Sequence, residues 1–184
     1  MNKQNFMPWL MWMLPTLFFA YQFIVRIIPG LIMPELMQKF AINATEYGLF
    51  ASIYYVGYAG IQIPLALLLD RYGPRHIISL CVLIVAFGTL MLIYTNHWLL
   101  ALVSRLLVGI GSAAGFLGTS KLISLWFPQH LYSRMIGLNC TFGLMGAVYG
   151  GKPMNVFISQ YGWENVLLFL SLIGFGMAIS FFLY

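Results

Sequence analysis

Three basic side chains lie inside long apolar segments of this chain, where a charge needs a partner. They are Arg26, Arg105 and Lys152. A charge at the centre of a membrane-spanning helix costs at least ~2.5 kcal/mol, so each side chain is expected to face a cavity or a partner. No acidic residue lies in the middle of any apolar segment. Because a guanidinium grips carboxylate or phosphate through two parallel hydrogen bonds, the pattern predicts an anionic ligand.

Snorkelling to the membrane surface is the alternative for these cations. It suits Lys152, which falls in the outer half of its segment, better than the two arginines. We therefore expect Arg26 to bind the anion, and Arg105 and Lys152 to tune the electrostatic field around it.

Polar and aromatic side chains accompany the first of these arginines. Tyr54, Tyr58 and Gln62 recur every four residues and would form one stripe on a helix. Tyr21 and Gln22 lie one turn before the arginine in the first apolar segment. These five side chains are candidates for a polar, aromatic wall of a substrate site. Simple packing, or a belt at the membrane interface, is the alternative.

Composition indicates an integral membrane protein. Apolar residues make up 61% of the chain and charged residues 7%, whereas a soluble domain carries roughly 25% charged residues. The strict alternation of a membrane β-barrel is missing, and a net charge of +5 is too thinly spread for a nucleic-acid surface. A helical span needs about 20 mainly apolar residues. We predict one all-α bundle of six transmembrane helices, with spans at about 8–33, 46–69, 74–94, 98–126, 135–159 and 165–184.

Short polar connections separate these spans. We expect a connection over 35–46, with Asn43 or Thr45 capping the second span, a loop over 127–134 and a turn over 160–164. Lysines and arginines gather on alternate connections, which places both chain ends in the cytoplasm by the positive-inside rule. The predicted inner face carries Lys3, Arg71, Arg75, Lys121 and Arg134, and the outer face carries Lys39, Glu35, Glu46 and Glu164.

The densest charge cluster lies between the second and third spans. Gly73 can end a helix in a left-handed conformation, and Pro74 can open the next one. Asp70 falls at a helix C-terminus, where the helix dipole disfavours a carboxylate. We expect an arginine to offset that cost; the candidates are Arg71, Arg75 and Arg134.

No catalytic or metal-binding set is present in the sequence. The histidines, His76, His97 and His130, fall at separate membrane surfaces. There is no zinc-ligand spacing, no phosphate-binding glycine loop and no nucleophile beside a base. We therefore expect neither an enzyme nor a cofactor.

Small residues give two of the spans a smooth face that lets helix backbones approach closely in lipid. Packing is the favoured interpretation of this pattern, and sliding of helices against one another is a further role. The glycines concerned are Gly109 and Gly111 in the fourth span and Gly143, Gly146 and Gly150 in the fifth.

These elements together resemble the major facilitator superfamily. The run from Ala66 to His76 resembles its loop motif Gly-x-Leu-x-Asp-Arg-x-Gly-x-Arg, with Ala66 in place of the first glycine. The run from Arg105 to Gly111 resembles its Arg-x-x-x-Gly-x-Gly element, and the glycine-rich fifth span resembles its fifth helix. Arg26, followed eight residues later by Pro34, resembles the first helix of the organic-anion and organophosphate permeases.

The resemblance implies the N-terminal half of a transporter, built of 3+3 inverted repeats, in the inner membrane of a bacterium. The implied function is secondary transport of a small organic anion by alternating access, with proton coupling or anion exchange as the alternatives. A second six-helix half would complete it: a C-terminal half, a separate chain or a second copy. Asp70, Arg71, Gly73, Arg75 and Arg134 would form a cytoplasmic latch. A non-transporting membrane scaffold, a degraded half-transporter and a channel are the rival interpretations.

The charge asymmetry of the connections predicts a topology. Cysteines placed at Lys39 and Glu164 should react with an impermeant thiol reagent from outside, and one at Arg75 only from inside. Labelling of Arg75→Cys from outside in intact cells would overturn the orientation.

Overall fold

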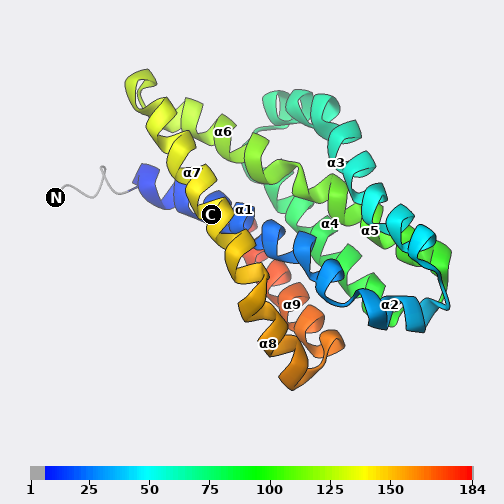
Figure 1. The fold of residues 1–184 in the computed structure, drawn as a ribbon. Helices are drawn as coiled ribbons and strands as arrows, with labels where there is room; N and C mark the ends of the chain where they lie inside the picture. The colour runs from blue at the N-terminus through cyan, green and yellow to red at the C-terminus, as the bar shows by residue number, and fades with distance from the viewer. Residues whose placement is uncertain (1–6, 184) are drawn as a thin grey trace.

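The computed structural model describes residues 7–183, which fold into an all-α bundle, as the composition predicts (Figure 1). No strand occurs within these residues. Lys3 and Tyr184, which the sequence placed at the cytoplasmic face and at the end of the last span, lie outside them. The helices are α1 (Met7–Leu31), α2 (Met33–Phe40), α3 (Ala44–Tyr72), α4 (Pro74–Tyr94), α5 (Trp98–Ser112), α6 (Ala114–Trp126), α7 (Gln129–Gly150), α8 (Lys152–Tyr161) and α9 (Trp163–Leu183).

Five segments of the described chain are long and apolar enough to cross a membrane. They are Met11–Leu31, Ala44–Tyr72, Pro74–Tyr94, Trp98–Trp126 (α5 and α6 together) and Trp163–Leu183. The fifth span expected from the sequence is instead two helices, because α7 ends at Gly150 and α8 begins at Lys152. Gly151 between them has φ of −86° and ψ of −115°, outside the helical range, so the helix does not continue through it.

Two connections differ from the sequence prediction. The polar stretch 35–46 holds most of the short helix α2, and the loop expected over 127–134 is wrong because α7 begins at Gln129. The predicted cap is confirmed for Asn43. Its side chain accepts from the backbone N–H groups of Thr45 and Glu46, and the Glu46 carboxylate accepts from the Asn43 N–H. This capping box fixes the start of α3.

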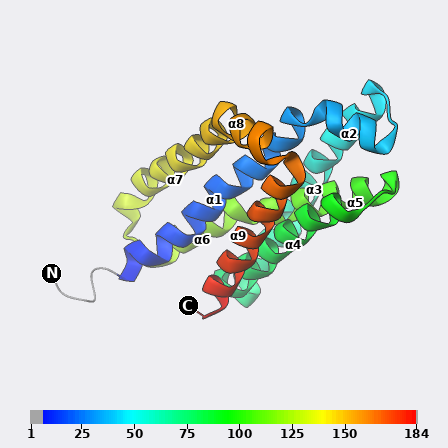
Figure 2. The ribbon, with the colours of Figure 1, turned by 90° about the horizontal axis from the view of Figure 1, so that it is seen from below.

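The bundle has two ends that can be named after their turns (Figure 2). The Gly73 end holds the start of α1, the turn at Gly73 and the end of α9. The Gly162 end holds α2 and the turn at Gly162. Each turn rests on a single glycine with φ of 81°, a conformation that side chains with a Cβ rarely adopt.

Helix α1 lies in the middle of the bundle, against α7 and α6 (Figures 1 and 2). The glycines of α7 make the contact close: a Cβ at Gly146 would collide with the backbone of Ala20, and one at Gly143 with the ring of Phe19. Gly109 of α5 lies in the same way against the Tyr54 carbonyl of α3. These contacts fix the two helices that carry the candidate site.

The α1–α7 contact predicts a contrast between two glycines of one helix. Gly146→Ala should lower the thermal stability of the detergent-solubilised protein by about 1–3 kcal/mol, because the added methyl group meets a backbone that cannot yield. Gly137→Ala is the matched control, since nothing lies within 4 Å of its added Cβ. Equal unfolding temperatures for the two variants would contradict close packing at Gly146.

Candidate anion-binding site

Arg26 lies on α1, half-buried, in a box of aromatic rings. Its guanidinium carbon is 4.9 Å from the ring centroid of Tyr55, 5.5 Å from that of Phe23 and 5.7 Å from that of Tyr54. Its Nη2 donates to the Tyr55 hydroxyl over 2.9 Å. Cation–π contacts of this kind contribute about 0.5–2 kcal/mol each. They help to hold the charge inside a membrane-spanning helix without a carboxylate.

Arg105, on α5, is buried between helices. It is 6% exposed, and its Nη2 donates to the backbone carbonyl of Arg26 over 2.8 Å. Its guanidinium carbon lies 4.7 Å from the ring centroid of Tyr54, so that this ring contacts both arginines. Arg105 thus has the partner that a charge in an apolar span was expected to need, and this partner is a backbone carbonyl of α1.

The tyrosine stripe of α3 divides into parts. Tyr54 is fully buried, donates to Gln22 Oε1 over 3.1 Å and stacks on Tyr58. Gln62 lies further along α3 and is exposed. Tyr21 lies elsewhere, because its hydroxyl donates to the Leu170 carbonyl of α9 over 3.0 Å. The structure thus brings Gln22, Tyr54 and Tyr58 together with the two arginines, but not Tyr21.

Lys152 is exposed at the first residue of α8. Gly150, two residues earlier, lies against Ile24 of α1, two residues before Arg26. Helices α1 and α7 pack side by side and run in the same direction. The backbone of Lys152 therefore lies at about the level of Arg26 along the bundle. The two cations therefore come from neighbouring helices at one depth.

Two members of the aromatic box, Tyr55 and Phe23, were not predicted. Tyr55 falls outside the every-fourth-residue stripe, and Phe23 reads as an ordinary lipid-facing residue. The one available signal was position: Phe23 precedes Arg26 by three residues, which places both on the same side of a helix.

The charge cluster at the Gly73 end has a different partner from the one expected. Asp70 Oδ1 lies 2.7 Å from Lys121 Nζ on α6, with the two side chains 62% and 34% exposed. The prediction of Arg71, Arg75 or Arg134 as the partner is wrong. Arg71 lies over the Tyr72 ring, and Arg75 donates to the Phe182 carbonyl near the end of α9. Exposed Arg134 forms no ion pair within residues 7–183.

A second cluster, at the Gly162 end, was not predicted. Lys39 Nζ donates to the Ile93 carbonyl over 2.6 Å and lies 3.7 Å from the Glu164 carboxylate. The same ammonium lies 4.8 Å from the Trp163 ring centroid. One side chain of α2 therefore joins the last carbonyls of α4 to the first turn of α9. Cations at helix C-termini are stabilised by the helix dipole.

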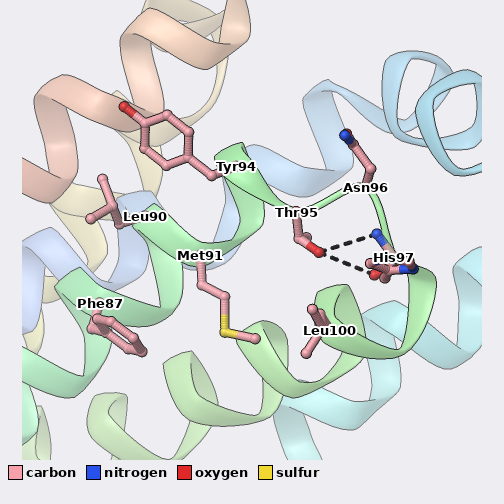
Figure 3. A pocket seen from close by; sticks show the side chains of 8 residues that line it. All are labelled: Phe87, Leu90, Met91, Tyr94, Thr95, Asn96, His97 and Leu100. Carbon is pink, nitrogen blue, oxygen red and sulfur yellow. Dashed lines mark hydrogen bonds between the residues drawn. The ribbon is translucent and has the colours of Figure 1, made fainter.

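Two grooves of the surface lie away from Arg26. One, of about 460 Å³, runs between α4 and α5 at the Gly162 end, where Thr95 and His97 are hydrogen-bonded (Figure 3). The other, of about 560 Å³, lies between α8 and α9 and is lined mainly by apolar side chains. Neither contains a lysine or arginine, so neither matches an anion. Within residues 7–183 no cluster of potential metal ligands occurs.

The long apolar helices of the bundle define a membrane protein. The sequence profile of the Major Facilitator Superfamily matches residues 14–184, and the chain belongs to this superfamily. The superfamily and the relatives below are transporters, so the expectation that the chain is not an enzyme is confirmed.

Curated relatives from bacteria and from a plant are named as transporters. The uncharacterized transporter YybO of Bacillus subtilis is 28% identical over 86% of this chain and 37% of its own length. The 4-hydroxybenzoate transporter PcaK of Pseudomonas putida is 29% identical over 76% of this chain and 31% of its own. The hexuronate transporter of Bacillus subtilis is 21% identical over 81% and 35%. The chain spans about a third of the length of these relatives.

A solved structure has the same fold. A bacterial homologue of the human lysosomal transporter Spinster, in an inward-facing and occupied conformation, matches 99% of this chain and 45% of its own with a TM-score of 0.81. Its sequence is 21% identical, so the likeness concerns the fold alone. Together with the family match it confirms the expected half of a major facilitator bundle.

The Asp70–Lys121 pair predicts a rescue by charge exchange. Asp70→Asn and Lys121→Gln should each impair transport while leaving insertion intact, since each removes the bond that joins α3 to α6. The exchange Asp70→Lys with Lys121→Asp should recover part of the loss. Because the Asp70 side chain is exposed and that of Lys121 is only half-buried, each single change should alter stability by less than about 1 kcal/mol. Unchanged uptake by both single variants at normal expression would remove the gating role.

Proposed function

We propose that this chain forms one half of a secondary transporter that moves a small organic anion by alternating access. The observation that carries the proposal is the Arg26 guanidinium. It is half-buried on a spanning helix, among aromatic rings, with a hydroxyl as its hydrogen-bond partner. A bound anion would supply the missing countercharge.

Three of the four acidic residues have partners at the ends of the bundle, which supports an external countercharge. Asp70 pairs with Lys121 and Glu164 with Lys39, both at the ends of the bundle. Glu46 belongs to the capping box of α3, and Glu35 lies on α2. These are all four acidic residues of the chain, and within residues 7–183 none forms an ion pair with Arg26 or Arg105.

An organic anion agrees with the names of the relatives. The PcaK and hexuronate transporters are named for 4-hydroxybenzoate and hexuronate, which are carboxylates of small organic molecules. Arg26 would bind the carboxylate, with Tyr54, Tyr58, Gln22 and Gln62 beside it. Arg105 would position Arg26, and Lys152 would add positive potential at the same depth. Proton coupling and exchange with another anion are the alternatives for how transport is driven.

The site in this chain would be completed by a second six-helix half. Alternating access rocks two such halves about a site near the bilayer midplane. Tyr55, Val56 and Ile63 of α3 and Val148 and Tyr149 of α7 are exposed large side chains on the helices next to α1 and α5. A C-terminal half, a separate chain or a second copy would cover them.

The orientation proposed from the sequence agrees with where the charges lie. Arg71, Arg75, Lys121 and Arg134 belong to the Gly73 end, and Lys39 with three glutamates to the Gly162 end. We infer that the Gly73 end faces the cytoplasm of a bacterium, with both chain ends inside. The Asp70–Lys121 pair then acts as a cytoplasmic latch that must open with α3 and α6.

Arg26 gives the central test. Arg26→Lys keeps the charge but loses the guanidinium fork, and Arg26→Ala loses both. Anion affinity should fall in both variants, and roughly 10- to 100-fold in the alanine variant, because a hydrogen bond to a charged group contributes about 1.5–3 kcal/mol. The measurement is uptake of 4-hydroxybenzoate and glucuronate into proteoliposomes that contain the chain with its second half, at matched insertion. Wild-type uptake by both variants would exclude Arg26 as the anion site.

A further inference from the structure

Two neighbouring tyrosines of α3 have different surroundings. Tyr54 is fully buried, and its hydroxyl is bonded to Gln22. Tyr55 is 51% exposed, next to the exposed Ser52 and Val56 of the same helix. Its hydroxyl accepts a hydrogen bond from Arg26 Nη2 over 2.9 Å. The Tyr55 hydroxyl is therefore a neutral hydrogen-bond partner of the Arg26 guanidinium.

The hydrogen-bonding capacity of this pair is only partly used. A tyrosine hydroxyl has one proton to donate as well as lone pairs that accept, and a guanidinium has five N–H donors. Within residues 7–183, the bond from Arg26 uses one acceptor site on Tyr55, and no acceptor takes the Tyr55 proton. The remaining N–H groups of Arg26 likewise have no acceptor among the described side chains and carbonyls. The Tyr55 hydroxyl and the remaining N–H groups of Arg26 are therefore, within the described part of the chain, free donors on two side chains that contact each other at a partly exposed position.

We propose that Tyr55 is a specificity-determining residue of the anion site: its hydroxyl donates to an oxygen of the same carboxylate that Arg26 binds. The inference rests on the proposed function and adds a second ligand to it. Accepting from a cation polarises the hydroxyl, and a polarised hydroxyl is a stronger donor. One carboxylate has two oxygens with about four lone-pair sites, enough to accept from a guanidinium N–H and a hydroxyl together.

The variant Tyr55→Phe distinguishes hydrogen bonding to the anion from packing of the ring. In Tyr55→Phe, the ring that lies 4.9 Å from the guanidinium and 5.3 Å from the Tyr54 ring is retained. Only the hydroxyl is lost, and with it both the acceptor for Arg26 Nη2 and the proton for the anion. A residue that acted by packing alone would tolerate this change, whereas a carboxylate ligand would not.

Binding of benzoate, 4-hydroxybenzoate and glucuronate to the whole transporter tests the inference. We expect Tyr55→Phe to lower the affinity for the carboxylate that binds by about tenfold, with the unfolding temperature of the ligand-free protein unchanged. The matched control is Tyr94→Phe, which removes a hydroxyl from an exposed tyrosine of α4 and should bind as wild type does.

A double variant, Arg26→Lys with Tyr55→Phe, shows whether the two residues act on one anion. Its loss should be smaller than the product of the two single losses, because the weakened grip at position 26 already displaces the anion from the hydroxyl. Product-like losses would overturn shared binding.

The two proposals fail in different ways. If the Arg26 variants lose affinity while Tyr55→Phe binds as wild type does, the role of Tyr55 is overturned and the proposed function stands. If wild type binds none of the three carboxylates, the proposed function is overturned, and the inference falls with it. A loss in Tyr55→Phe that is matched by a lower unfolding temperature of the ligand-free protein would assign Tyr55 to packing instead.

Discussion

A cation inside a lipid bilayer must find hydrogen-bond acceptors within the protein, and this constraint organises the centre of the bundle. Arg105 meets it with the backbone carbonyl of Arg26, three residues before Pro29. A carbonyl oxygen has two lone pairs, so the Arg26 carbonyl can accept from Arg105 as well as from its own helix, and the carbonyls in the last turn of a helix have no donor within it. Tyr47 uses the carbonyl of Pro29 itself over 2.8 Å. The far half of α1 is therefore held by side chains of α3 and α5 at the turn that presents Arg26.

The parts of this arrangement that depend on composition and local spacing were predictable from the sequence. Apolar segment length predicts helices, and an Asn three residues before a Glu predicts the cap of α3. The partner of Asp70 was not predictable, because Lys121 is far away in sequence and the register of α6 on α3 decides their contact. The break at Gly151 was also missed, since glycines that allow close packing look the same as glycines that end a helix.

The candidate site shows the same division. The arginines were found because a charge in an apolar span is costly wherever it lies. Their different tasks were not, because a sequence does not tell whether a guanidinium points to a cavity or to a carbonyl. Tyr55 was missed for a related reason. Residues spaced by four lie on one face of a helix, whereas Arg26 contacts the rings of two consecutive residues of α3, Tyr54 and Tyr55.

The two glycine turns have a consequence for how the protein comes to sit in a membrane. Tyr72-Gly73 and Tyr161-Gly162 share their residue types and nearly the same backbone angles, with ψ of 156° and 149°. They occupy equivalent positions in the two inverted repeats of a major facilitator half, one at each end of the bundle. Because the two repeats have the same backbone shape in opposite orientations, that shape does not determine which end of the bundle faces the cytoplasm. The charges carry that information, because Arg71 and Arg75 flank one turn and Glu164 follows the other. A few charged surface side chains therefore determine the orientation in which this fold inserts into a membrane. Exchanging those charges between the two turns would bias the same bundle toward the opposite orientation.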